Sequence, residues 1–276
     1  MTNLKIGFSN DLRQISIVTR YEMLKHLRSK KLLTFAIITM AILVLITAIY
    51  LGSAAGFPED PKEFMSSYVS LLFLFLIIGV SMFCASAIAS EFDERTALLI
   101  FPRPMKRISL FIGKALASFI VIGIVILLYY SISMVLCLAK TGSVPASAFA
   151  SMGMAMLFVL GAGGFALLMS TVFKKGLIAV IVTLLVLLLV MWFIVDLMVG
   201  PILNIEPVFS VTYGSGGITN VINGFVSYSE TFEIEGMGSV TTSTFFPSNV
   251  TAIAIMSIYA IFTTTLAALL FSRKEF

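Results

Sequence analysis

Long apolar runs and short polar interruptions alternate along most of this chain. A helix needs about 20 consecutive apolar residues to cross the roughly 30 Å hydrocarbon core of a bilayer. Six runs reach that length, and they cover residues 32–54, 65–90, 108–138, 146–173, 177–199 and 249–271. The pattern predicts an all-α polytopic membrane protein with six transmembrane helices. These spans and their connections form one domain, 1–276, which leaves little chain for a soluble catalytic domain.

The charged residues agree with this picture and add an orientation. Charged residues make up only 12% of the chain, about half the share found in a soluble globular domain. Fifteen of the 18 basic residues lie before span one, between spans two and three, between spans four and five, or after span six, and Lys114 lies near the start of span three on the same side. Only Lys62 and Lys140 lie in other connections. Because basic loops stay inside, we expect a multi-pass protein of the cell membrane with both termini in the cytoplasm. Basic residues sorted by loop do not indicate a nucleic-acid partner.

Residues 1–31 form a basic leader before the first span. Its apolar residues recur at every third position between basic ones, at Leu12, Ile15, Val18, Tyr21, Leu24 and Leu27. The composition favours an amphipathic helix on the inner leaflet, although a three-residue repeat drifts around a helix of about 3.6 residues per turn. A solvated basic segment that only sets the topology is an equal alternative.

Residues 91–107 interrupt the apolar pattern between spans two and three. The interruption opens with a helix-capping signature and acidic residues in the first turn, at Ser90, Glu91, Asp93 and Glu94. Five apolar residues follow at 97–101, and then Pro102 and Pro104 prevent the helix from continuing. We interpret the segment as a short cytoplasmic helix that docks on a partner, since an exposed apolar stretch is typical of an interaction surface. A loop that packs on its own bundle is an equal alternative.

Two ionisable residues and two sets of small residues stand out within the spans. Lys114 is expected to extend from span three to the lipid headgroups, with a buried functional lysine as the less favoured alternative. Asp196 in span five is expected to reach water at the outer boundary, rather than to form a substrate or proton site. Small residues predict close helix packing, or in span four a kink, at Ser81, Ala85, Ala89, Gly161, Gly163 and Gly164.

The connection 200–248 is the one long loop, and we expect it to form a small extracellular subregion. It contains no lysine or arginine, and its acidic residues are Glu206, Glu230, Glu233 and Glu235. Residues 207–228 are apolar enough to return toward the bilayer as short re-entrant helices, broken around Gly214, Gly216 and Gly217. Residues 231–246 alternate around Gly236-Met237-Gly238, which predicts a β-hairpin.

Motifs for catalysis are not visible in the sequence. His26 is the only histidine, so neither a histidine metal cluster nor a Ser-His-Asp arrangement is available. Gly113-Lys114 lacks the remaining residues of a P-loop. The chain is therefore not expected to be an enzyme or to bind a cofactor itself. Because the spans carry few acidic residues, ion-coupled transport is poorly supported, and the energy for any active transport is expected to come from another polypeptide.

The whole chain resembles an ABC-2 type permease, the membrane subunit of type V ABC transporters. The resemblance lies in the basic leader, the six spans, the short turn after span four, the large outer segment before span six, and above all the charged stretch after span two. That stretch follows a loose family pattern, which falls here on Glu91, Thr96, Leu98, Leu99, Pro104, Arg107, Gly113 and Lys114. A glycine commonly precedes the threonine of the pattern, and Arg95 stands at that position here.

The resemblance implies a permease that pairs with a second copy or with a similar permease, and that carries two cytosolic ATPase subunits in which ATP and Mg²⁺ bind. The leader would be an elbow helix, residues 91–101 a coupling helix, and residues 200–228 re-entrant helices over the translocation path. The residues implied in contact with the ATPase are Glu91, Glu94, Thr96, Leu98, Leu99 and Phe101, and Pro104 and Arg107 would form the turn that follows.

The function implied is export of a hydrophobic or amphipathic substrate. An alternative is a mechanotransmission or maturation permease, which acts on an extracellular partner protein and moves no solute itself. A purely structural membrane scaffold is a third possibility.

Overall fold

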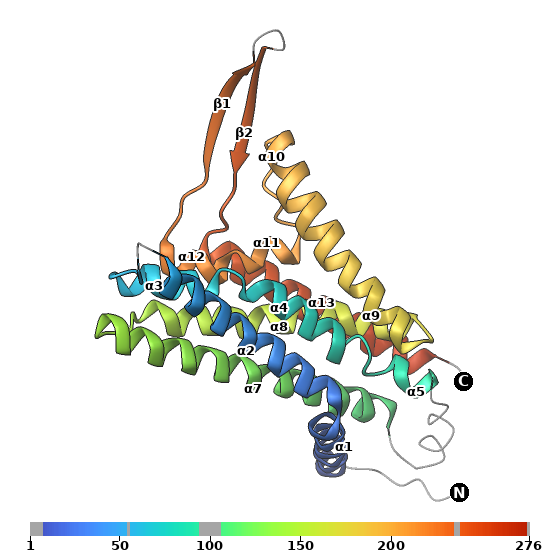
Figure 1. Cartoon of the computed structure of the whole chain (residues 1–276). Helices are drawn as coiled ribbons and strands as arrows, with labels where there is room; N and C mark the ends of the chain where they lie inside the picture. The colour runs from blue at the N-terminus through green and yellow to red at the C-terminus, as the bar shows by residue number, and fades with distance from the viewer. Residues whose placement is uncertain (1–7, 54–55, 94–105, 235–237, 275–276) are drawn as a thin grey trace, which may run out of the picture.

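The computed structural model describes residues 8–53, 56–93, 106–234 and 238–274. Six helical segments in these ranges are long and apolar enough to cross a membrane: Lys30–Gly52, Pro61–Phe83, Arg107–Thr141, Ser147–Val172, Gly176–Leu203 and Asn249–Arg273. The six predicted spans are therefore confirmed as helices. Both termini lie at one end of the bundle and a β-hairpin projects from the other (Figure 1). We call these the basic end, after the lysines and arginines near the termini, and the hairpin end.

Four spans are single α-helices with recognisable ends: α2 (Lys30–Gly52), α7 (Arg107–Thr141), α8 (Ser147–Val172) and α13 (Asn249–Arg273). Helix α7 stops at Gly142, whose φ of 77° is the left-handed conformation that glycine adopts without strain. Helix α13 starts after Ser248, whose hydroxyl accepts a hydrogen bond from the N–H of Thr251 at 3.1 Å. At about 1.5 Å per residue, the 35 residues of α7 extend well beyond a hydrocarbon core.

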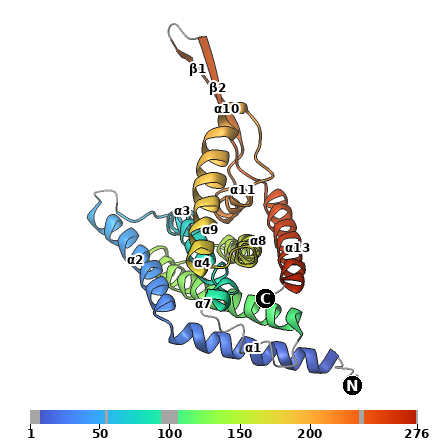
Figure 2. The same ribbon diagram turned by 90° about the vertical axis from the view of Figure 1, so that its right-hand side faces the viewer.

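Helix α8 occupies the centre of the bundle and packs against α4, α7, α9 and α13; Figure 2 shows it end-on among them. Its glycines allow these close approaches. A Cβ atom on Gly161 would lie 2.9 Å from the carbonyl oxygen of Met256, and one on Gly164 would lie 2.5 Å from Thr263 Oγ1, both on α13. The predicted close packing at these glycines is therefore confirmed, and the helical hydrogen bonding of α8 continues through them.

Span two is less regular than the sequence predicts. It consists of α3 (Pro61–Val69) and α4 (Leu72–Phe83), and after an unwound stretch at 84–88 the chain continues as the short helix α5 (Ala89–Asp93). The prediction of one run over 65–90 was wrong in this respect, and the span begins at Pro61 because Asp60 caps it. Ser170 Oγ of α8 accepts the N–H groups of Ile88 and Ala89 at 2.9 and 3.0 Å. A hydroxyl from a neighbouring helix thus satisfies backbone donors that the unwinding exposes.

Span five combines α9 (Gly176–Leu184), a π-helical stretch η1 (Leu185–Val199) and α10 (Gly200–Leu203). Figure 1 shows it leaving the other spans at an angle toward the hairpin end. In its most apolar stretch of 18 residues, only 17% of the residues are buried, compared with 56% in the corresponding stretch of α8. Most of this span therefore presents apolar side chains to lipid or to another protein chain.

The connection between spans five and six contains two short helices, α11 (Val211–Ser215) and α12 (Gly217–Asn223), and a hairpin of β1 (Tyr228–Ile234) and β2 (Gly238–Thr244). The helices meet at Gly216, one of the glycines around which the sequence predicts a break. The residues of α11 are buried against the bundle. The strands pair antiparallel from Tyr228 opposite Thr244 to Ile234 opposite Gly238, three residues earlier than the predicted start.

Helix α1 (Phe8–Arg28) belongs to the basic leader and crosses the basic end of the bundle against α7 (Figure 2). Within α1, the side chain of Val18 is buried, whereas that of Tyr21 is 71% exposed. The described part of the leader is therefore a helix with one face on the protein.

Candidate functional site

The predicted coupling residues fall mostly outside the described residues. Glu94, Thr96, Leu98, Leu99, Phe101 and Pro104 all belong to the range 94–105, whose structure is not described. Glu91 and Arg107 lie on its two sides, in α5 and at the start of α7. The contacts of these flanking residues define how the segment 94–105 is attached to the bundle.

On the first side, Glu91 belongs to a compact group of four charged residues. Lys114 Nζ of α7 donates to Glu91 Oε1 at 2.8 Å and to Glu22 Oε1 of α1 at 2.5 Å. Lys25 Nζ of α1 lies 3.4 Å from the same oxygen of Glu91. We call these residues, Glu22, Lys25, Glu91 and Lys114, the Lys114 cluster. Its two lysines balance its two glutamates, and the buried ammonium group of Lys114 requires such partners.

The burial of Lys114 differs from the sequence expectation. Its side chain is only 2% exposed, and those of Glu22 and Glu91 are 16% and 12% exposed. The lysine does not extend to headgroups, because α1 and α5 cover it and supply two carboxylates. The partners are 92 and 23 residues away in sequence, so no local pattern could reveal the pairing.

Gly113 explains why α1 comes close enough to reach Lys114. A Cβ atom at Gly113 would lie 2.6 Å from Val18 Cγ1, a distance that real side chains do not adopt. Thr19 Oγ1 of α1 also lies 3.3 Å from the carbonyl oxygen of Gly113. Since Glu22 follows Val18 by four residues on the same face of α1, the close crossing at glycine places its carboxylate on Lys114. At the start of span three, Gly113 thus allows the close approach of α1, and Lys114 forms the ion pair with it.

His26 adjoins the same region. Its ring packs edge-on against Phe83 at the end of α4, with ring centroids 5.3 Å apart. Burial lowers the pKa of the His26 imidazole, and the nearby positive charges of Lys114 and Lys25 lower it further, against an opposing effect of Glu22. The imidazole is therefore neutral at pH 7 and acts as a packing group.

The second side of the segment is attached through Lys106 and Arg107. Lys106 Nζ lies 2.6 Å from Asp11 Oδ2, near the start of α1. Arg107 Nη1 donates to the carbonyl oxygen of Lys274 at 2.7 Å, just beyond α13. Lys274 Nζ in turn donates to the carbonyl oxygen of Thr171, in the last turn of α8, at 2.6 Å. The described residues on the two sides of 94–105 are thus held by the bundle, Glu91 by α1 and α7, and Lys106 and Arg107 by α1 and by the end of α13, which contacts α8.

A comparison with known families agrees with this architecture. The family described as ABC-2 family transporter protein matches residues 16–276, which is nearly the whole chain. The chain belongs to the ABC-2 transporter family. No curated protein is significantly similar to it in sequence.

Membership makes this ABC-2 protein the membrane component of a transporter, a kind of subunit that is typically non-catalytic and that associates with an ABC ATPase. The resemblance drawn from the sequence is thereby confirmed at the level of the family. Within the described ranges, no three His, Cys, Asp or Glu side chains are placed to hold a metal ion.

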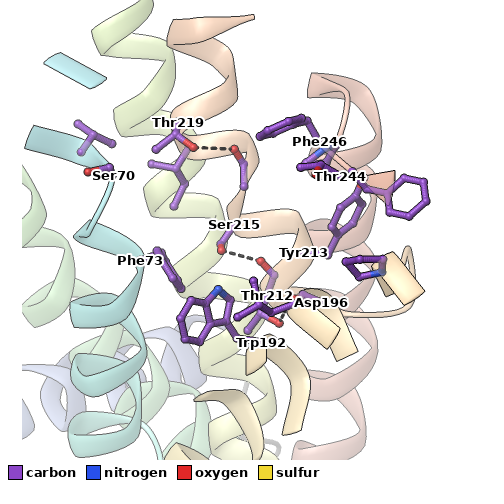
Figure 3. Close-up of a pocket in the computed structure, with 17 residues that line it drawn as sticks. Ser70, Phe73, Trp192, Asp196, Thr212, Tyr213, Ser215, Thr219, Thr244 and Phe246 are labelled. Carbon is purple, nitrogen blue, oxygen red and sulfur yellow. Dashed lines mark hydrogen bonds between the residues drawn. The ribbon is translucent and has the colours of Figure 1, made fainter. Parts of the chain in front are cut away.

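This ABC-2 protein also has a cavity of about 500 Å³ at the hairpin end. Residues of η1, the start of α4, α11, α12 and the chain after β2 line it, and Asp196 is among them. Figure 3 shows Phe73 and Trp192 side by side on one wall, with Asp196 and Thr212 next to the indole ring. Thr212 Oγ1 donates to Asp196 Oδ2 at 2.6 Å. Asp196 therefore does not simply reach water, as the sequence suggested, because α11 packs against it.

Proposed function

We propose that this protein is the permease subunit of an ABC exporter, which converts ATP hydrolysis by two separate cytosolic ATPase subunits into movement of a hydrophobic or amphipathic substrate across the membrane. ATP and Mg²⁺ bind in the ATPase subunits and not in this chain. The basic end faces the cytoplasm in this proposal, in keeping with the positive-inside rule. The working unit contains two permeases, either two copies of this chain or this chain and a similar one.

The observation that carries the proposal is that the described residues on the two sides of 94–105 are held by the bundle. Glu91 on one side is paired with Lys114 of α7, which is also paired with Glu22 of α1. Lys106 and Arg107 on the other side contact Asp11 and the backbone beyond α13. A partner that displaces this segment pulls on α1, α7 and α13 together, because buried ion pairs and close-packed helices move as rigid units. The segment is therefore a suitable input for mechanical work from an ATPase.

The apolar residues of the segment supply the docking surface in this proposal. Replacing Leu98, Leu99 and Phe101 by Asp places charges where an apolar contact with the ATPase is expected, and burial of an unpaired charge is strongly unfavourable. We expect the ATPase subunits to be lost when the variant is purified in a mild detergent from cells that express the complete transporter. The amount of ATPase recovered per permease is the measurement.

The matched control replaces three exposed apolar residues at the hairpin end, Phe225, Val226 and Tyr228, by Asp. This control adds the same charge at the opposite end and is expected to retain the ATPase. The proposal is contradicted if no ATPase accompanies the intact protein, or if the variant at 98, 99 and 101 retains as much ATPase as the control.

A second candidate function is mechanotransmission to an extracellular protein, and the hairpin favours it. Strands β1 and β2 project beyond the bundle (Figures 1 and 2), and a two-stranded sheet leaves both edges available to pair with another strand. Glu230 is exposed on β1. This candidate predicts that a hairpin-dependent exported protein is recovered with the complex, and that reconstituted vesicles move no solute. Solute movement that survives replacement of residues 228–244 by a short Gly-Ser linker would exclude it.

A further inference from the structure

The cavity at the hairpin end has the size and lining of a small-molecule site. Its volume of about 500 Å³ falls within the range of about 300 to 1,000 Å³ of known ligand pockets. The wall from span five consists of Trp192, Asp196, Leu197 and Pro201. These positions recur every four or five residues, which matches the wide turn of the π-helical stretch η1. An ordinary α-helix would rotate some of these side chains out of the cavity.

Asp196 is the charged group of the cavity, and its charge is not balanced. Thr212 satisfies Oδ2, whereas Oδ1 is buried and accepts no hydrogen bond from the described residues. The sequence contains no lysine or arginine from 176 to 272, and no ion pair in the described ranges includes Asp196. Because Oδ1 is itself out of solvent reach, the feature open to a ligand is the unbalanced negative charge of the carboxylate, which favours a positively charged group in the cavity.

Aromatic rings line the same cavity. The ring of Phe73 lies 5.3 Å from that of Trp192 between centroids, and Tyr213 and Phe246 line the opposite side (Figure 3). The Tyr213 hydroxyl donates to Glu206 Oε1 at 2.7 Å, which brings a second carboxylate close to the cavity. Aromatic faces attract cations and also accept apolar groups. Asp196 is the one carboxylate among the lining residues, and a carboxylate among aromatic rings suits an organic cation, whereas a metal ion requires more oxygen ligands.

We propose that this cavity binds an organic cation with an apolar body, whose positive charge lies against Asp196 and whose apolar groups pack on Trp192 and Phe73. The inference names a substrate class for the proposed exporter, and it rests on the proposed function only for the step from binding to export. Binding itself requires neither the ATPase nor nucleotide, so the two proposals fail separately.

The chain contains one tryptophan, Trp192, and its position in the cavity makes fluorescence a direct test. The purified full-length permease without ATPase subunits, in a neutral detergent, is titrated with tetraphenylphosphonium while the tryptophan emission is recorded. The same titration uses tetraphenylborate, an ion of similar size and shape and of opposite charge. We expect a saturable change in emission with the cation and none with the anion. This comparison uses the unaltered protein and so does not depend on the folding of a variant.

The Asp196→Asn variant removes the charge and keeps an oxygen that can accept from Thr212. We expect it to weaken cation binding about ten-fold, as loss of one charge-assisted contact predicts. The matched control is Glu63→Gln, which removes an exposed carboxylate at the same end of the molecule but outside this cavity, and it is expected to bind as the unaltered protein does. Equal responses to both ions, a response that never saturates, or equal affinities of Asp196→Asn and the unaltered protein would overturn the proposal.

Discussion

Lys114 is the residue on which the basic end of the molecule depends. A lysine side chain that is 2% exposed keeps its charge at acceptable cost only because Glu22 and Glu91 both contact it. The contact also joins three helices, α1, α5 and α7. The residues that meet are far apart in sequence, with Glu22 and Glu91 lying 92 and 23 residues before Lys114. Charge pairing at Lys114 therefore holds α5 against α1 and α7.

Replacing Lys114 by Met tests this role at the level of stability. Glu22 and Glu91 then remain partly buried without the Lys114 ammonium group, although Glu91 keeps its contact with Lys25. We expect the free energy of unfolding to fall by about 3 kcal/mol, as for other broken buried ion pairs. Thermal unfolding of the purified protein in detergent measures the change. Lys62→Met, an exposed position at the hairpin end, is the control and is expected to have little effect.

A compensated variant makes the prediction sharper. Combining Lys114→Met with Glu22→Gln and Glu91→Gln removes the uncompensated charge and is expected to recover part of the lost stability, because fully neutral replacements of buried ion pairs are often tolerated. If the triple variant is less stable than Lys114→Met alone, burial of charge is not the reason for the loss.

At the scale of elements, the crossing of α1 over α7 is the contact that brings the Lys114 cluster together. The crossing is close because Gly113 has no side chain where Val18 packs. Small residues allow such approaches between helices. The geometry of the cluster therefore depends on a residue that carries no charge itself.

Gly113→Ala is expected to separate the two helices. The added Cβ meets Val18 at 2.6 Å, and overpacking of this kind costs about 1 to 3 kcal/mol. Thermal unfolding provides the measurement, and Val18→Ala in the same chain is expected to restore much of the loss. Gly123→Ala on the same helix is the matched control, since its Cβ would lie 3.6 Å from Met156 Sδ, an ordinary contact. A loss at Gly113 that Val18→Ala does not reduce would argue against a steric origin.

The spans could be predicted from the sequence because the signal for a membrane helix is local. A run of about 20 apolar residues is sufficient, and the six predicted runs match the six helices within a few residues at most ends. The break in span two could not be predicted, because the hydroxyl of Ser170, which accepts the freed N–H groups, lies about 80 residues further along the chain. The helical character of each span could thus be predicted from the sequence, whereas the break in span two and the π-helical stretch in span five could not.

The candidate sites were less predictable than the spans for the same reason. The sequence singled out Glu91 and Lys114 separately, yet their pairing and the contribution of Glu22 from α1 are long-range contacts. Asp196 stands out in the sequence as an isolated acid, but its partner Thr212 meets it only through the packing of α11 on η1. The residues that recognise a partner at 94–105 remain a prediction from the family resemblance.

For the whole molecule, the distribution of charge predicts the orientation in the membrane. Basic residues are concentrated at the end that bears the termini, whereas the long connection at the hairpin end has none. Loops on the cytoplasmic side of a membrane are enriched in lysine and arginine, and the negatively charged inner leaflet attracts them. The hairpin is therefore expected outside the cell and the termini inside.

Single cysteines introduced at exposed positions test this orientation. The natural cysteines, Cys84 and Cys137, are buried and give little background. We expect a membrane-impermeant maleimide to label Glu230→Cys, on the hairpin, in intact cells. Lys175→Cys, in the turn between α8 and α9, is expected to react only after the membrane is opened. The opposite result would reverse the orientation.

The Lys114 cluster is the proposed link between an ATPase and the membrane helices, and the ATP hydrolysis rate of the intact transporter complex tests that link most directly. Lys114→Met is expected to retain its ATPase subunits, because the residues of the proposed docking surface, 98–101, are unchanged. Its hydrolysis rate is expected to fall by at least about five-fold, the lower range of coupling between sites, while Lys62→Met keeps the normal rate. A complex of Lys114→Met with a full complement of ATPase and an unchanged hydrolysis rate would contradict the central claim.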